Sequence, residues 1–259
     1  MAALLEAESV ATYRHADFDA AALAGLKRRE RVLVCIPARD EEATIGHIVS
    51  TIRRRLQDEV ALVDEVLVVD DASRDSTALV AKEEGATVVA GPGDGKGQAM
   101  ALARSRADLV VFLDGDVANF DAHFVTGLLG PLLTRPRTLL VKGAYDRPVA
   151  PGGGGGGRVT ELVAKPLLAL LFPALAGFRQ PLAGETAVRR RVLEELELAP
   201  GYGVEIGLLI DAAARFGLEA LAQVDLGVRT HRNRPLAELS VQAGEVMQAA
   251  LSRARVESP

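Results

Sequence analysis

The feature that most constrains the fold is a regular alternation of apolar runs with segments of helical periodicity. Five apolar runs, RVLVCIP, VDEVLVVDD, ATVVAG, DLVVFLDGD and TLLVKGAY, lie between residues 31 and 145, and helical segments separate them. Unbroken aliphatic runs are typical of strands that are buried on both faces of a sheet. The alternation therefore predicts an α/β fold with an open, mostly parallel sheet.

The chain after residue 150 has a different pattern. PGGGGGG predicts a low-complexity loop, LEALAQVDLGV a late strand and PLAELSVQAGEVMQAALSRA a C-terminal helix. Further helices are predicted at residues 21–30, 159–176, 189–196 and 204–216. We expect one compact domain with a helical N-terminal segment (1–30), an α/β half (31–148) and a mostly helical half (149–259).

Composition excludes several classes of protein. The 259 residues carry a formal net charge of -5, which argues against a non-specific nucleic-acid binder. One cysteine and four histidines exclude a Cys/His zinc module and an internal disulfide framework. Because the chain has no disulfide framework, a cytoplasmic protein is predicted. Cys35 lies in an apolar run and is expected to be a buried packing residue.

The most apolar stretch, LVAKPLLALLFPALAGF at residues 162–178, raises the question of a membrane span. It has about the minimum spanning length, but it contains Lys165, Pro166 and Pro173. We therefore expect no membrane span here but a buried or dimer-forming helical hairpin. The first twenty residues have no basic n-region, so no secretory signal is expected.

Acidic tips follow three of the predicted strands: PARDEE, DDASRD and DGD. In open α/β sheets, ligands bind beyond the carboxyl ends of the strands. Asp114 and Asp116 flank Gly115, and a turn at the glycine would bring both carboxylates to one divalent cation. A polar turn without function is the alternative for this triplet.

Two segments have the character of anion sites. GPGDGKGQ places Lys96 among glycines before a helix, although it is not a Walker A sequence. GGGRVT places Arg158 and Thr160 where a glycine loop enters a helix, which suits an anionic acceptor. The alternatives are an ordinary turn with a solvated lysine and a disordered loop.

Two later segments add candidates. GVRTHRNRP combines Arg229, Arg232 and Arg234, which suit phosphate or carboxylate, with Asn233 and His231. The neighbouring cations favour a neutral His231 imidazole, a good metal ligand, unless the segment is only a solvated basic turn. APGYGVEIGLLID places Glu205 in the first turn of a helix, where the helix dipole alone would stabilise it or where it would contact a sugar.

The order PARDEE, VVDDASRDST, GKGQA, VVFLDGD, GGGRVTELVAKPLL, QPLAGE, APGYGVEIGLLID and AQVDLGVRTHRNRPL resembles the glucosyl-3-phosphoglycerate synthases. The resemblance runs from about residue 31 to residue 253, and its specific parts are GRVTELVAKPLL, APGYGVEIGLLID and HRNRPL. It implies the glycosyltransferase A fold and a retaining transfer of glucose from UDP-glucose to the 2-hydroxyl of 3-phosphoglycerate. Mg²⁺ or Mn²⁺ is the implied cofactor, and a homodimer is expected.

The resemblance also implies roles for individual residues. It makes 31–148 the nucleotide-sugar-binding half and 149–259 the acceptor-binding half. The implied nucleotide-sugar residues are Pro37, Ala38, Arg39, Asp40, Glu41, Asp71, Lys96, Asp114, Gly115, Tyr202, Gly203, Val204, Glu205, Arg229, Thr230, His231, Arg232, Asn233 and Arg234. The implied acceptor residues are Gly157, Arg158, Val159, Thr160 and Asn233, and the implied metal ligands are Asp116 and His231. Glu205 is the candidate catalytic residue, which would position the sugar hydroxyls or assist the transfer.

Three positions depart from the family pattern. Gly115 stands where serine is common, Arg39–Asp40 stands where a residue followed by asparagine is expected, and Asp71 stands where serine is usual. No separate nucleophilic carboxylate is evident for the other face of the sugar. Retention is therefore expected to proceed by front-face attack, with the leaving diphosphate taking the acceptor proton.

Three other functions compete with this one. A related transferase would use polyprenyl phosphate as acceptor or would make mannosylglycerate-type solutes from GDP-mannose. A sugar nucleotidyltransferase would carry an N-terminal glycine-rich Arg-Lys loop, which RVLVCIPARDEE lacks. A binding module without turnover is disfavoured by the joint presence of Lys96, Asp116, Glu205 and His231.

Overall fold

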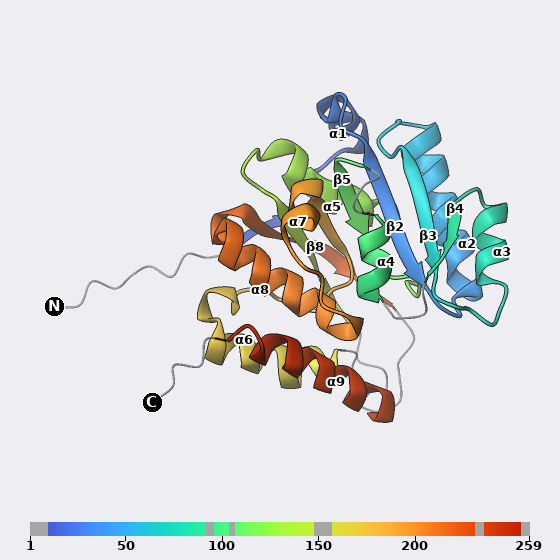
Figure 1. Cartoon of the computed structure of the whole chain (residues 1–259). Helices are drawn as coiled ribbons and strands as arrows, with labels where there is room; N and C mark the ends of the chain where they lie inside the picture. The colour runs from blue at the N-terminus through green and yellow to red at the C-terminus, as the bar shows by residue number, and fades with distance from the viewer. Residues whose placement is uncertain (1–9, 92–95, 104–106, 148–156, 231–235, 255–259) are drawn as a thin grey trace, which may run out of the picture.

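The five apolar runs form strands β2 to β6 of an eight-stranded sheet (Figure 1). The strand order is β1-β8-β6-β7-β5-β2-β3-β4, so β1 and β4 are the edge strands. The computed structural model describes residues 10–91, 96–103, 107–147, 157–230 and 236–254. The strands are β1 Ala11–Arg14, β2 Val32–Ala38, β3 Glu65–Asp70, β4 Thr87–Ala90, β5 Leu109–Phe112, β6 Leu140–Asp146, β7 Thr186–Arg189 and β8 Leu221–Val228. All neighbouring strands are parallel except that β7 runs antiparallel to β5 and β6. The prediction of a mostly parallel α/β sheet is therefore confirmed.

Two short strands, β1 and β7, are not apparent in the sequence pattern. β1 is an edge strand whose four residues, ATYR, are mostly exposed, so no apolar run marks it. β7 is equally short and passes directly into helix α7, Arg190–Glu195. The N-terminal segment thus holds a strand as well as a helix, and the half after residue 149 contributes β7 and β8 to the same sheet.

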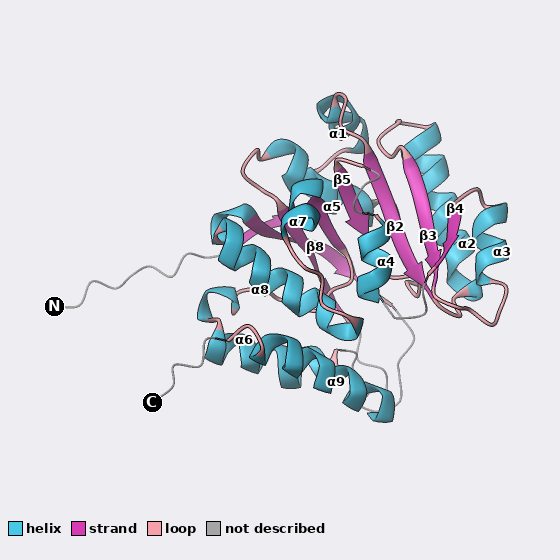
Figure 2. Cartoon of the chain, in the orientation of Figure 1, coloured by secondary structure: helices cyan, strands magenta, loops and turns pink. Residues whose placement is uncertain are grey.

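Helices cover both faces of the sheet (Figure 2). One face packs against α1 Ala20–Lys27, α2 Glu42–Ile52, α3 Thr77–Glu83 and α5 His123–Thr134. The other face packs against α4 Lys96–Leu102, α7 and α8 Val204–Phe216, with α6 Lys165–Leu171 and α9 Leu236–Leu251 joining the same core. Val34 and Cys35 on β2 are both fully buried and belong to opposite cores, because successive strand residues point to opposite faces.

The apolar stretch at residues 162–178 is not one continuous helix. A π-helical turn at Thr160–Ala164 leads into α6, and a 3₁₀ turn at Pro173–Leu175 follows it. Proline lacks the N–H that a continuing helix requires, which explains the break at Pro173. Within the described part of the chain, no helix is long and apolar enough to cross a bilayer.

The carboxyl ends of β2, β3 and β5 meet at one edge of the sheet. Asp71 N donates to Ala38 O at 2.9 Å, and Leu113 N donates to Cys35 O at 3.1 Å. These bonds align the segments that follow each strand. The predicted acidic tips therefore lie side by side.

Candidate active site

The two aspartates after β5 converge on one cation. Arg229, the residue after β8, places its Nη2 atom 2.9 Å from Asp114 Oδ2 and 2.7 Å from Asp116 Oδ1. Gly115 O accepts a hydrogen bond from Thr44 Oγ1 at 2.6 Å, which anchors the turn between the aspartates to α2. The structure thus brings together two carboxylates and an arginine that lies 115 residues from Asp114 in the sequence.

Lys96, at the first position of α4, joins the same cluster from the other side. Its ammonium contacts Asp114 and lies 2.9 Å from Glu205 Oε1. Glu205 occupies the first turn of α8 and is buried. The contact with Lys96 shows that this glutamate is part of a charged site as well as an acidic residue in the first turn of a helix.

A glycine that the sequence analysis did not single out makes this approach possible. A Cβ at Gly184 would overlap Asp114 Oδ1 and Lys96 Nζ. At Gly115, by contrast, a Cβ would lie 3.4 Å from Glu41 Cγ and 3.5 Å from Ala38 Cβ, which are ordinary contacts. The Cβ of a serine, the residue that the resemblance leads us to expect at this position, would therefore fit at Gly115.

Glu185 is a second carboxylate that sequence reasoning missed. Its side chain is fully buried, its Oε1 lies 3.0 Å from Arg229 Nε, and neither of its oxygens accepts a hydrogen bond from the described residues. Tyr145 OH lies on the same arginine, 3.5 Å from Nη1, and also accepts a hydrogen bond from Arg147 Nη2 at 3.1 Å. Arg229 therefore contacts carboxylates along two of its edges. The only sequence signal for Glu185 is its place in the motif QPLAGE.

Burial and charge act in opposite directions on the pKa values of this cluster. Burial alone would raise the pKa of Asp114, but Lys96 and Arg229 outweigh it and hold that pKa below its ordinary value. Burial alone would lower the pKa of Lys96, but the negative charges of Asp114 and Glu205 outweigh it and raise that pKa. For Glu185 burial prevails over Arg229, so the pKa of this carboxyl is raised.

Lys142, in the middle of β6, is a buried cation beneath the cluster. Its Nζ donates to Ala183 O at 2.5 Å and to Thr186 Oγ1 at 3.0 Å. Burial lowers the pKa of Lys142 to about 8, against a partial opposing effect of Glu205. These two neutral acceptors solvate the ammonium less fully than water does.

The turn after β2 is held by hydrogen bonds to the turn after β3. Asp40 has a left-handed backbone with φ of 56°, its N donates to Ser73 Oγ at 3.0 Å, and its Oδ1 accepts from Arg74 N at 2.7 Å. Glu41 N donates to Thr77 Oγ1 at 2.8 Å. Asparagine shares the tolerance of aspartate for this backbone conformation, which explains why either residue suits position 40.

Other implied nucleotide-sugar residues lie near these turns. Pro37 is half-buried, Ala38 is buried and Arg39 is exposed. The Oδ1 atom of Asp71 is buried and has no hydrogen-bond partner among the described residues. A buried carboxylate oxygen in this condition is suited to accept a hydrogen bond from a ligand.

The Gly-Tyr-Gly turn before α8 is fixed by the C-terminal helix. Tyr202 N donates to Glu245 Oε2 of α9 at 2.7 Å. A Cβ at Gly203 would lie only 2.8 Å from Ala249 Cβ, so the turn packs closely against α9. Val204 is fully buried, and Glu205 follows it into the cluster.

The implied acceptor segment begins at Gly157, which has a left-handed φ of 85°. Val159 and Thr160 are buried, whereas Arg158 is exposed. Glu161 N donates to Gly157 O at 2.9 Å, which starts the helical turn. A Cβ at Gly157 would lie 3.0 Å from Arg147 Nη1, so this segment adjoins the arginine after β6.

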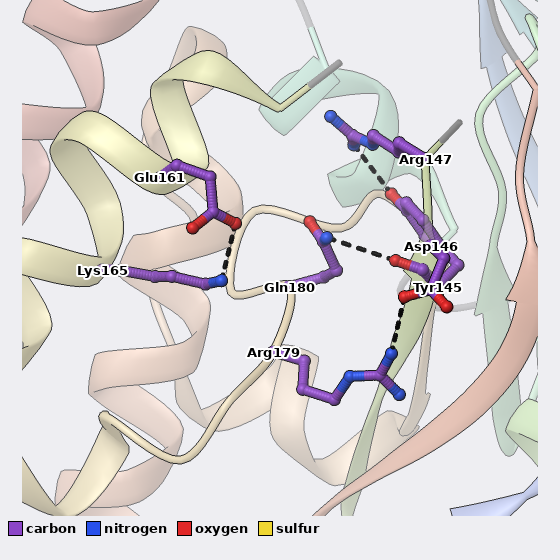
Figure 3. Close-up of a pocket in the computed structure, with 7 residues that line it drawn as sticks. All are labelled: Tyr145, Asp146, Arg147, Glu161, Lys165, Arg179 and Gln180. Atoms are coloured by element: carbon purple, nitrogen blue, oxygen red, sulfur yellow. Dashed lines mark hydrogen bonds and ion pairs between the residues drawn. The ribbon is translucent and has the colours of Figure 1, made fainter. Parts of the chain in front are cut away.

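A polar cavity of about 250 Å³ lies beside this segment (Figure 3). Its lining residues are Tyr145, Asp146, Arg147, Glu161, Lys165, Arg179 and Gln180. Arg179 Nη2 pairs with Asp146 Oδ1 at 2.9 Å, and Lys165 Nζ pairs with Glu161 Oε1 at 2.6 Å. Arg147 Nε is buried without a hydrogen-bond partner among the described residues. Three cations against two acids make this cavity suitable for a small anion.

Part of the implied site lies outside the described residues, namely His231, Arg232, Asn233 and Arg234. Thr230 is described: its N donates to Asn119 Oδ1 at 2.8 Å, and its O accepts from Ala118 N at 3.0 Å. The end of β8 is therefore tied to the loop that follows Asp116. Among the residues that the structure describes, no group of three or more His, Cys, Asp or Glu side chains is arranged to hold a metal ion.

Known proteins are similar to this chain over most of its length. Residues 33–153 match the family described as glycosyl transferase family 2. A glucosyl-3-phosphoglycerate synthase of Mycolicibacterium paratuberculosis is 48% identical over 250 residues, which cover 90% of this chain and 75% of that protein.

Solved structures show the same similarity. Glucosyl-3-phosphoglycerate synthase from Mycobacterium tuberculosis, in complex with Mn²⁺, UDP and glucosyl-3-phosphoglycerate, is 43% identical with a TM-score of 0.87, over 96% of this chain and 89% of that one. That protein has also been solved with Mg²⁺ and UDP. Mannosyl-3-phosphoglycerate synthase from Rubrobacter xylanophilus is 41% identical with a TM-score of 0.87, over 94% of this chain and 80% of that one.

Proposed function

Because this chain belongs to the glucosyl-3-phosphoglycerate synthase family, we propose that it transfers glucose from UDP-glucose to the 2-hydroxyl of 3-phosphoglycerate with retention of configuration. It is a metal-dependent glycosyltransferase of the glycosyltransferase A fold. The observation that carries the proposal is the convergence of Asp114, Asp116, Lys96, Glu205 and Arg229 at the carboxyl edge of the sheet.

Asp116 is the residue that we propose as the metal ligand from the described part of the chain, with His231 as its partner. A carboxylate suits Mg²⁺ and Mn²⁺, and Asp116 already faces a cation, the guanidinium of Arg229, at 2.7 Å. The residues present therefore fit a divalent cation. When bound, the cation supplies positive charge that stabilises the leaving diphosphate.

Lys96 and Arg229 supply the protein's own positive charge for the diphosphate. Asp71 and the segment Pro37–Glu41 would hold the uridine, with Asp114 and Gly115. Glu205, with its neighbours Tyr202, Gly203 and Val204, would contact the glucose. The ion pair between Lys96 and Glu205, at 2.9 Å, would hold the Glu205 carboxylate beside the proposed diphosphate-binding lysine.

Glu205→Gln tests the role of this carboxylate. We expect kcat to fall about 100-fold, because the glutamine amide carries no negative charge and cannot accept a proton as a base. The KM for UDP-glucose should change by less than about threefold, since uridine and diphosphate contacts remain. Full turnover by the variant would remove Glu205 from the mechanism.

Retention is proposed to proceed on one face of the sugar. A double displacement needs a carboxylate that can reach the anomeric carbon. Glu185 is fully buried and paired with Arg229 Nε, so we do not expect its carboxylate to reach the anomeric carbon. In the front-face reaction, the acceptor 2-hydroxyl attacks as the sugar–diphosphate bond breaks, and its proton passes to the leaving diphosphate oxygen.

The acceptor is proposed to lie along Gly157, Arg158, Val159 and Thr160, with Asn233. The cavity beside this segment adds Arg147, whose Nε has no hydrogen-bond partner among the described residues. The phosphate and the carboxylate of 3-phosphoglycerate are both anionic, so they suit a cavity that is lined by more cations than acids.

The deciding experiment is a coupled assay of nucleoside diphosphate release with purified protein and Mn²⁺. UDP release that requires 3-phosphoglycerate is expected, and glycerate or polyprenyl phosphate should not replace it. Absence of phosphoglycerate-dependent UDP release would overturn the proposal. The likeness to a mannosyl-3-phosphoglycerate synthase makes mannose transfer the second candidate, and GDP-mannose in the same assay distinguishes it.

We also propose a homodimer in the cytoplasm. Leu162 and Leu170 are 75% and 79% exposed near α6, and Val241 is 61% exposed on the neighbouring α9. Exposed apolar side chains on neighbouring elements are a candidate interface. Light scattering should give twice the monomer mass for the native chain and the monomer mass for Leu170→Glu; a native monomer would exclude the dimer.

A further inference from the structure

We propose that Arg229 is an exchangeable internal cation: it occupies the Asp116 carboxylate in the metal-free enzyme and must leave it before a divalent cation binds there. The inference rests on the proposed function and adds to it a route by which metal and nucleotide affinities are coupled. It also assigns Glu185 as the positioning residue that retains the arginine during the exchange.

The first observation is that one atom of Arg229 serves both aspartates. Nη2 lies 2.9 Å from Asp114 Oδ2 and 2.7 Å from Asp116 Oδ1, so the two carboxylates share a single positive group. Arg229 is only 2% exposed, so water does not screen its charge effectively. A divalent cation bound to Asp116 would lie next to Nη2, and the two cations would repel each other.

The second observation is that the rest of the guanidinium has partners that do not involve Asp116. Nε lies 3.0 Å from Glu185 Oε1, and Nη1 lies 3.5 Å from Tyr145 OH. Breaking the contacts of Nη2 therefore leaves the arginine in contact with a fully buried carboxyl group and a buried phenol. This explains why a carboxylate is buried at position 185 although its oxygens accept no hydrogen bond from the described residues.

The exchange predicts cooperation between metal and nucleotide. Once released from Asp116, Nη2 needs a new acceptor, and a diphosphate oxygen is a strong one for arginine. Nucleotide binding thereby favours the released arginine, and the released arginine favours the metal. By thermodynamic linkage, the two ligands raise each other's affinity by the same factor.

Lys96 offers a matched control for simple electrostatics. It also contacts Asp114, but among the described residues its ion-pair partners are Asp114 and Glu205, not Asp116. Removing either cation makes the site more negative by one charge. Only removal of Arg229 also frees the metal ligand.

The experiment is a titration of Mn²⁺, followed by the electron paramagnetic resonance signal of the free ion, with and without UDP. For the nucleotide-free protein, we expect Arg229→Gln to bind Mn²⁺ at least about tenfold more tightly than the native chain, and Lys96→Gln to change the affinity less than about threefold. The factor by which UDP tightens Mn²⁺ binding should shrink in Arg229→Gln. Equal effects of the two substitutions, or no tightening by Arg229→Gln, would overturn the proposal.

Two further measurements keep the test decisive if Arg229→Gln alone misfolds. Glu185→Gln/Arg229→Gln removes both partners of the buried pair, and we expect it to bind Mn²⁺ as tightly as Arg229→Gln. Crystal structures of the native chain with and without Mn²⁺ and UDP should show the Arg229 Nη2–Asp116 Oδ1 distance lengthening beyond about 3.5 Å. An unchanged distance would contradict the exchange. None of these readouts requires turnover, so failure of the glucosyl transfer assay would leave them interpretable.

Discussion

The turns that we propose to hold the uridine and the charged cluster lie at the same edge of the sheet but are held by different forces. The turns, Pro37–Glu41 and Asp71–Thr77, are joined by hydrogen bonds between backbone N–H groups and neighbouring side chains. The cluster is held by ion pairs among Lys96, Asp114, Asp116, Glu205 and Arg229. A ligand therefore meets a preformed surface at the turns, whereas in the cluster it must replace partners that the side chains already have.

The largest expected effect belongs to Asp116, the proposed metal ligand in the cluster. Asp116→Asn should lower kcat/KM about 1,000-fold, because the amide binds a divalent cation weakly and leaves the diphosphate charge unbalanced. Mn²⁺ titration should show a matching loss of affinity, and thermal melting should show that the fold persists. If the variant retained more than a tenth of the native activity, Asp116 would not be the ligand.

The second prediction compares one substitution at two glycines of the cluster. Gly184→Ala places a Cβ onto Asp114 Oδ1 and Lys96 Nζ, so both must move, and kcat/KM should fall about 100-fold. Gly115→Ala meets only ordinary contacts and should keep activity within about twofold. Steady-state kinetics of the two variants decide the matter. Similar kinetics for both would mean that the close approach at Gly184 is not needed for activity.

The sequence predicts where the turns and most of the charged cluster lie. The five apolar runs and the acidic tips identify the parallel strands and the edge where they end, because both signals are local and periodic. Asp114, Asp116 and Lys96 are recognisable from their glycine-rich context. The role of Asp40 becomes clear only with its left-handed backbone, which no spacing of residues reveals.

Glu185 and Gly184 could not be found in this way. They precede β7, which enters the sheet between β5 and β6 in the antiparallel direction, and no local pattern predicts that insertion. A lone glutamate beside a glycine has no distinctive spacing. Its contact with Arg229 depends on the tertiary arrangement of β7 and β8, so it becomes visible only in the folded chain.

The third prediction concerns pH and the buried Lys142. Its pKa of about 8 in the folded chain is below the ordinary value of 10.5, so between these values the unfolded chain binds more protons. The free energy of unfolding of the native chain should therefore rise with pH relative to that of Lys142→Met. Between pH 8 and 9.5 the gain should be about 1 to 2 kcal/mol. Urea unfolding at several pH values measures it, and a constant difference would show that the ammonium is not strained.

The smallest effect is expected in the turns, and it should appear in stability rather than in chemistry. Asp40→Ala removes the acceptor of Arg74 N and puts alanine into a left-handed backbone, which together should lower the free energy of unfolding by about 2 kcal/mol. Asp40→Asn is the matched control, because asparagine tolerates this backbone and its amide oxygen accepts the same bond, so its change should stay below about 0.5 kcal/mol. Urea unfolding measures both, and kcat should stay within about threefold in each. A large fall in kcat with unchanged stability would show that Asp40 takes part in the reaction. The contrast between turns that shape the site and a cluster that carries out the reaction would then be wrong.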